Sequence, residues 1–147
     1  MNRRGFTLIE LLVTITILGI LANIAIPKFG DARRRADAAK IISDFNAIRH
    51  AVYDYNATSG RYPRSQSYGT VPPELVNSLT DGFDFEYKDA RYRWRRWASA
   101  TGVPRNNAPA LFGVQIQSSD RKLIQAINSI YQGVKFGNAR TITLVIE

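Results

Sequence analysis

The chain has 147 residues, which is enough for one domain with a hydrophobic core plus an N-terminal extension. It contains no cysteine, which excludes disulfides, thiolate nucleophiles and cysteine-ligated zinc but does not indicate a compartment. Its 20 lysines and arginines exceed its 12 aspartates and glutamates and give a formal net charge of +8. Such a charge suits nucleic acid, anionic lipid or an acidic partner and does not choose among them.

Residues 6–26 form an apolar run whose single charged residue is Glu10. A helix of this length rises roughly 31 Å at about 1.5 Å per residue, which matches a hydrocarbon core of about 30 Å. A cleaved secretory signal is the competing interpretation, but its apolar part would be shorter and would end in a small-x-small site, which the run lacks. The run therefore predicts a membrane-spanning helix.

Glu10 needs an explanation, because a charge at the centre of a membrane helix costs at least about 2.5–3.5 kcal/mol. One explanation is local, since Thr7 and Glu10 have the spacing of a capping box at a helix start. The other is a partner made by processing. Cleavage after Gly5 would leave an α-amine on Phe6, within reach of Glu10 on the same helix or on a shifted neighbour.

Residues 1–30 resemble the prepilin-type N-terminal segment of type IV pilins and type II secretion pseudopilins, through the strings GFTLIELLV (5–13), ILGILA (17–22) and IAIP (24–27). The resemblance implies that a prepilin peptidase cuts after Gly5 and methylates the amine of Phe6. It also implies that Glu10 pairs with the Phe6 amine of an adjacent subunit and so sets the register of helices in a filament.

The same resemblance implies where the protein acts and with what. The expected partners are prepilin peptidase, other pilin or pseudopilin subunits, an inner-membrane assembly platform and the lipid bilayer. The expected location is the bacterial inner membrane, with a single pass and a periplasmic head, and after assembly a periplasmic or cell-surface filament. The chain lacks the cysteine-bounded loop of many major type IV pilins and the calcium-loop pattern of a major pseudopilin, which favours a minor pilin or a pseudopilin.

Several residues interrupt the aliphatic pattern of the apolar run. Thr14, Thr16 and Asn23 are polar, and we expect them to hydrogen-bond to their own backbone or to a neighbouring helix. Pro27, with Gly30 three residues later, predicts a bend in a continuing helix. The alternative is that Pro27 ends the membrane helix.

Residues 28–58 predict an amphipathic helical stem. Its apolar stripe has steps of three and four residues and consists of Ala38, Ile41, Phe45, Ile48, Val52 and Tyr55. Gly60 and Pro63 predict the end of the stem, and the string GRYP at 60–63 resembles a turn common after the stem in pseudopilins and minor pilins. The resulting division is 1–5 leader, 6–27 transmembrane or filament-core helix, 28–58 stem and 59–147 globular head.

The head is predicted to be a loop with a helical turn at 74–79, followed by antiparallel strands at 83–87, 91–95, 112–117 and 141–146. In the first hairpin, Tyr87 would lie opposite Tyr92 and Phe85 opposite Trp94. A helix over 120–132 would be capped by Ser118 or Ser119 and stopped by Gly133. The predicted fold class is α+β, a long N-terminal helix packed on a small antiparallel sheet.

An arginine-rich strand suggests a second function. Arginines interleaved with aromatic residues suit nucleic acid, and the residues in question are Arg91, Arg93, Arg95, Arg96, Trp94 and Trp97. A solvated strand face is the simpler interpretation, since acidic residues of the hairpin would offset the charge. Among the alternatives to a filament subunit are a DNA-uptake pilin with this face as its DNA-binding surface and a membrane-anchored binding module that does not polymerise.

The sequence offers no catalytic residues and predicts that the chain is not an enzyme. It has no glycine-rich phosphate loop and no pair of histidines, and the carboxylates near residues 81–89 alternate with aromatic residues of a strand. We therefore expect no cofactor and no metal site.

Overall fold

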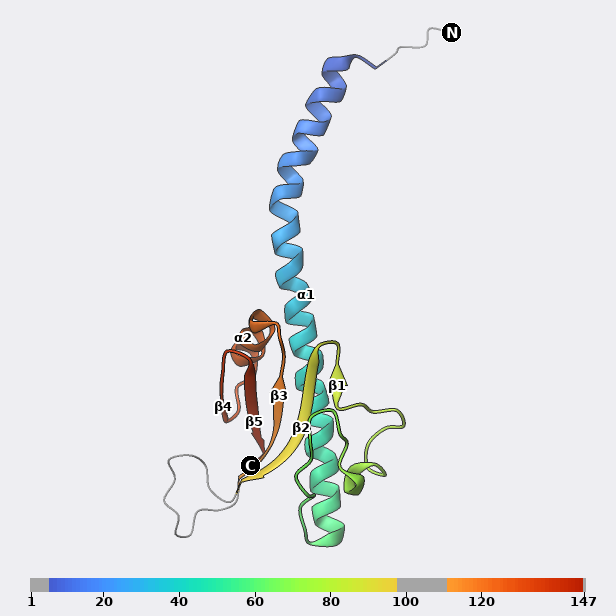
Figure 1. Cartoon of the computed structure of the whole chain (residues 1–147). Helices are drawn as coiled ribbons and strands as arrows, with labels where there is room; N and C mark the ends of the chain where they lie inside the picture. Colours follow the sequence, from blue (N-terminus) through green and yellow to red (C-terminus); the bar gives the residue numbers. More distant parts are fainter. Residues whose placement is uncertain (1–5, 98–110, 147) are drawn as a thin grey trace. The chain divides into compact units, whose positions relative to one another are not determined.

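The computed structural model describes residues 6–97 and 111–146. The chain divides into two compact units, Met1–Arg34 and Arg35–Glu147. The elements, in chain order, are α1 (Leu8–Ser59), the 3-10 helix η1 (Pro73–Leu75), β1 (Glu86–Tyr87), β2 (Ala90–Trp97), β3 (Leu111–Gln117), α2 (Arg121–Ile130), β4 (Lys135–Asn138) and β5 (Thr141–Ile146) (Figure 1).

The first unit consists of the N-terminal part of α1. The helix is unbroken from Leu8 to Ser59, so the alternative that Pro27 ends it is wrong. The bend expected at Pro27 and Gly30 stays a prediction. Thr14 and Thr16 donate their hydroxyl hydrogens to the carbonyl oxygens of Leu11 and Leu12, at 2.8 and 2.7 Å, as expected of polar residues in an apolar helix.

In the second unit, the predicted apolar stripe of α1 lies in the core. Ala38, Ile41 and Ile48 have no exposed surface, while Tyr55 is half-buried. The helix ends at Ser59, and Gly60 follows at φ 66°, a conformation that costs glycine little and other residues more. The predicted stripe is therefore buried, and the helix ends directly before Gly60, while the division of the chain at residues 27 and 58 stays a prediction.

The sheet is antiparallel throughout, with strand order β1-β2-β3-β5-β4 (Figure 1). Its inner face packs on the stripe of α1 and on Leu123, Ile124 and Ile127 of α2. The side chains of this face alternate along the strands, as the period of two requires, and those in the core are Tyr92, Trp94, Val114, Ile116, Ile142, Leu144 and Ile146. The α+β prediction is confirmed.

The predicted register of the first hairpin is wrong by two residues. Tyr87 pairs with Ala90 and Glu86 with Arg91, around a two-residue turn in which Lys88 has φ 56°. The strand before the turn is also shorter than predicted, because β1 begins only at Glu86. A shift of two residues leaves the faces unchanged, so Phe85 stays on the aromatic face but meets Tyr92 instead of Trp94, with ring centroids 6.4 Å apart.

Three local predictions in the head are also corrected. Asp120, not Ser118 or Ser119, caps α2, since its side chain accepts from the backbone N–H groups of Lys122 and Leu123. The helix ends at Ile130 with Tyr131 as its C-cap, before Gly133. The helical turn predicted at 74–79 is the 3-10 helix Pro73–Leu75, and strand β4 was not predicted.

Candidate functional site

The first feature of functional interest is the start of α1. Oε2 of Glu10 accepts hydrogen bonds from the backbone N–H and the hydroxyl of Thr7, at 3.0 and 2.9 Å, and Glu10 N donates to Thr7 Oγ1 at 3.3 Å. The capping box is therefore formed. Within the described part of the chain, Oε1 of Glu10 accepts no hydrogen bond. Phe6 lies next to this box and is 83% exposed, and Gly5 lies outside the described residues.

The apolar surface that follows is uncovered. Every side chain from residue 6 to residue 26 is exposed. α1 contains an 18-residue window with a mean hydropathy of 2.3, and none of this window is buried. By length and composition, the helix could cross a membrane. Since the backbone of a helix satisfies its own hydrogen bonds, such a surface is stable in lipid or against other apolar helices. The segment is thus suited to membrane anchoring.

The stem is joined to the first hairpin through two aspartates of α1. Asp37 accepts from the hydroxyl of Tyr87 at 3.1 Å and forms an ion pair with Lys88. The hydrogen bond to Asp37 raises the pKa of Lys88 above its ordinary value. These contacts hold the β1–β2 turn against the helix.

Asp44, a charged residue of the stem, is buried. It accepts from the hydroxyl of Tyr92 at 3.2 Å and pairs with Lys40. Burial raises the pKa of Tyr92 far above its ordinary value, and the neighbouring Asp44 carboxylate raises it further. The phenol is therefore held protonated as a donor.

Asp89 ties the hairpin to the start of α2. Its Oδ2 accepts from the hydroxyls of Ser118 and Ser119, both at 2.7 Å, and from the backbone N–H groups of Ser119 and Asp120, at 3.1 and 3.3 Å. Burial alone would raise the pKa of Asp89, but these hydrogen bonds outweigh it, so the pKa lies below its ordinary value. The sequence analysis missed this cluster, although the run Ser118-Ser119-Asp120 is a sequence signal for such a turn.

The arginine-rich strand β2 presents two different faces. Trp94 is fully buried, and its indole N–H donates to the Pro63 carbonyl at 2.9 Å. It is therefore not available to stack on a base, which corrects that part of the predicted nucleic-acid surface. Arg96 is exposed, and its backbone N–H donates to Ser65 Oγ at 3.0 Å.

The other arginines of β2 lie on the face of the sheet turned away from α1. Arg91 Nε lies 3.7 Å from Glu86 Oε1. The guanidinium of Arg93 lies 4.3 Å from the ring centroid of Tyr68, and that of Arg95 lies 5.7 Å from the ring of Trp97. The acidic hairpin residues expected opposite Arg93 and Arg95 are not there, because the register places Glu86 opposite Arg91 instead.

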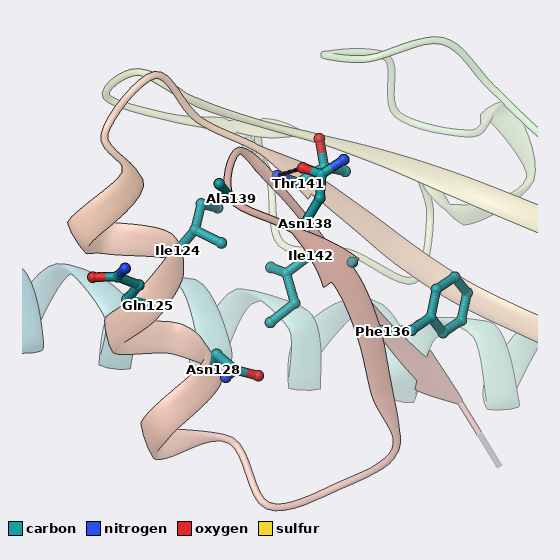
Figure 2. Close-up of a pocket in the computed structure, with 9 residues that line it drawn as sticks. Ile124, Gln125, Asn128, Phe136, Asn138, Ala139, Thr141 and Ile142 are labelled. Carbon is teal, nitrogen blue, oxygen red and sulfur yellow. Dashed lines mark hydrogen bonds between the residues drawn. The ribbon is translucent and has the colours of Figure 1, made fainter.

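A hollow of about 290 Å³ lies between α2 and the β4–β5 hairpin. Figure 2 shows Ile124 from α2 and Ile142 from β5 lining it, with Asn128 and Asn138 at its edge. Asn138 Oδ1 also closes the hairpin turn by accepting from the backbone N–H of Thr141 at 3.0 Å. No residue lining the hollow is ionisable, so it offers no acid or base for catalysis.

Comparisons with known proteins agree with the resemblance of residues 1–30 to a prepilin-type segment. Residues 1–25 match the model of the prokaryotic N-terminal methylation motif. The chain is 35% identical over 89 residues to type II secretion system core protein G of Klebsiella michiganensis (56% of this chain, 63% of that protein) and 38% identical over 89 residues to the Dickeya chrysanthemi protein of the same name (56% and 58%). It is 30% identical over 132 residues to type IV major pilin protein PilE1 of Neisseria gonorrhoeae (72% and 62%).

The chain spans about three fifths of the length of these relatives. No solved structure matches it. The relatives are named as a secretion-system core protein and a pilin, which supports a structural subunit and not an enzyme. The chain therefore carries the prepilin-type N-terminal segment of the type IV pilin and type II secretion pseudopilin family, and it is related to members of that family over more than half of its length.

Proposed function

We propose that this chain is a filament subunit, a minor pilin or a pseudopilin. Prepilin peptidase removes residues 1–5 by cutting after Gly5 and methylates the new amine of Phe6. Before assembly, the subunit lies in the inner membrane with its head in the periplasm. The assembly platform then packs its N-terminal helix with those of other subunits. The product is a type IV pilus or a type II secretion pseudopilus.

The observation that carries this proposal is Oε1 of Glu10, which accepts no hydrogen bond from any described residue. The capping box uses Oε2 alone, so Oε1 remains able to accept from the Phe6 amine of a neighbouring subunit. A carboxylate in lipid costs at least about 2.5–3.5 kcal/mol, and the ammonium group of a neighbouring subunit would offset part of that cost in the assembled state. Glu10 would thus both cap its own helix and favour the register in which a neighbour supplies the cation.

The test is intact mass and N-terminal sequencing of the full chain, produced in a host with prepilin peptidase and an assembly platform. We expect a mature chain that begins at methylated Phe6, and no processing of Gly5→Ala. Glu10→Gln should be processed and membrane-bound but absent from sheared fibres.

Two control variants separate the roles of Glu10. Thr7→Ala breaks the capping box and leaves Glu10 charged, so it should still give fibres. Asp31→Asn removes a carboxylate outside the apolar run and should leave fibres unchanged. An uncut N-terminus, a cut near Ala25, or normal fibre yield with Glu10→Gln would contradict the proposal.

A further inference from the structure

Three arginines of β2 form a regular basic row on the outer face of the sheet. Arg91, Arg93 and Arg95 alternate with the inward Tyr92 and Trp94, so they are two residues apart, or about 6.6–6.8 Å along the strand. Their partners on β3 are Gln117, Gln115 and Gly113, none of which is acidic. We call Arg91, Arg93 and Arg95 the arginine row.

Two side chains of the arginine row are positioned by contacts with neighbouring residues of the head. Arg93 donates its Nε–H to Gln115 Oε1 at 2.7 Å and rests on Tyr68, while Arg95 rests on Trp97. Neither arginine forms an ion pair with a described residue, and no described residue binds their terminal nitrogens, which could therefore bind a carboxylate. A guanidinium fixed in this way loses little side-chain freedom on binding.

A complementary acidic surface lies on the side of the head that faces α1. A hollow of about 290 Å³ is lined by the loop of residues 80–84 and by Lys40 and Asp44 of α1. Asp81 and Asp84 are exposed there and form no hydrogen bond or ion pair with any other described residue. Among the described residues, no contact therefore joins Asp81 or Asp84 to the arginine row, although Glu86, which also lines the hollow, pairs with Arg91.

We propose that the arginine row of one subunit docks on Asp81 and Asp84 of a second copy of this chain. This contact rests on the proposed filament function, because packed N-terminal helices hold the heads of neighbouring copies at high effective concentration. In a filament each copy is related to the next by the same rotation and translation, so the contact would be heterologous and would repeat along an open helical array. Opposite charges on the two surfaces would select one arrangement of the heads and oppose others.

Charge reversal tests the contact in the full chain, with sheared fibre yield as the readout. We expect Arg93→Glu with Arg95→Glu, and separately Asp81→Lys with Asp84→Lys, to reduce the yield at least about fivefold. Combining all four changes in one chain should restore it. The matched control, Arg121→Glu with Lys122→Glu, changes the net charge equally on the exposed start of α2 and should leave the yield unchanged.

Cysteine cross-linking gives a second readout that does not depend on charge reversal being tolerated. The chain has no native cysteine, so Arg93→Cys in one copy and Asp84→Cys in another should form one disulfide-linked dimer on mild oxidation. A copy with Ser129→Cys, mixed with a copy with Asp84→Cys, should form no disulfide-linked dimer.

The outcomes separate this contact from the filament function itself. Absence of fibres from the unaltered chain would refute the proposed function and this contact together. Fibres of equal yield in every charge variant, with no dimer between residues 93 and 84, would refute the contact alone. So would arginine variants that assemble normally and lose only binding to a single-stranded oligonucleotide, because the row would then serve a nucleic acid.

Discussion

Removing one hydroxyl, with Tyr92→Phe, tests how the sheet is attached to the stem. Tyr92 is 1% exposed, and its hydroxyl donates to Oδ2 of Asp44, which is 6% exposed. Lys40 pairs with the other oxygen, Oδ1. The substitution keeps the aromatic ring in the core and leaves one oxygen of a buried carboxylate without its donor.

The expected cost follows from that geometry. A hydrogen bond to a charged acceptor contributes about 1.5–3 kcal/mol, and the 3.2 Å separation and the remaining Lys40 pair favour the lower half of this range. We expect Tyr92→Phe to lower the free energy of unfolding by about 2 kcal/mol. For a unit of this size that corresponds to a fall in Tm of about 8 °C.

Urea denaturation of residues 35–147 at pH 7 measures the change, with circular dichroism and tryptophan fluorescence as probes. The matched control is Tyr62→Phe, since Tyr62 stacks on Phe112 with ring centroids 3.8 Å apart and its hydroxyl makes no hydrogen bond among the described residues. The double variant Tyr92→Phe with Asp44→Asn should lose less free energy of unfolding than its two single variants lose together. Equal urea midpoints for Tyr92→Phe and Tyr62→Phe would refute the reasoning. So would a double variant whose loss of unfolding free energy equals the sum of the losses of its two single variants.

Three further outcomes are expected of the same unit. The raised pKa of Tyr92 keeps it protonated when folded, so stability should fall as the pH rises above about 10, and less steeply in Tyr92→Phe, as followed by urea midpoints. The pKa of Asp89 is lowered, so the ionised carboxylate should stabilise the folded unit above pH 3.8, and this contribution should be lost as the pH falls below that value. At pH 7, Asp89→Asn should lower the free energy of unfolding by about 1 kcal/mol in the same assay. Gly137→Ala should destabilise by more than about 1 kcal/mol, because its Cβ would lie 2.1 Å from the Thr141 carbonyl oxygen; an unchanged Tm would contradict this.

Periodicity predicted the parts of the fold that bury a regular apolar face. The stripe containing Ile41 and Ile48, and the alternation of Ile142 and Leu144, located α1, β5 and the core. The burial of Asp44 did not follow from that pattern, because its partner Tyr92 is distant in the sequence. Periodicity therefore describes the apolar side of a contact better than the polar groups that accompany it.

The turns and the short strand were harder to predict, because they depend on contacts distant in the sequence. The hairpin register follows from a two-residue turn that places Asp89 within reach of Ser118 and Ser119. β4 has a single apolar residue of the kind that marks a strand, Phe136, and owes its conformation to pairing with β5. Likewise, the sequence predicted the residues of the arginine-rich strand but not the burial of Trp94, whose partner is the Pro63 carbonyl.

The short strand β1 leaves most of the neighbouring edge of β2 to be covered by other means. The loop after α1 does this: Gly69 N donates to the Tyr92 carbonyl at 2.8 Å, Gln66 N to the Trp94 carbonyl at 3.1 Å, and Ser65 Oγ accepts from Arg96 N. An uncovered edge of eight residues would pair readily with strands of other copies. The loop thus blocks amyloid-like strand pairing between heads, which would otherwise compete with the helix packing proposed for the filament.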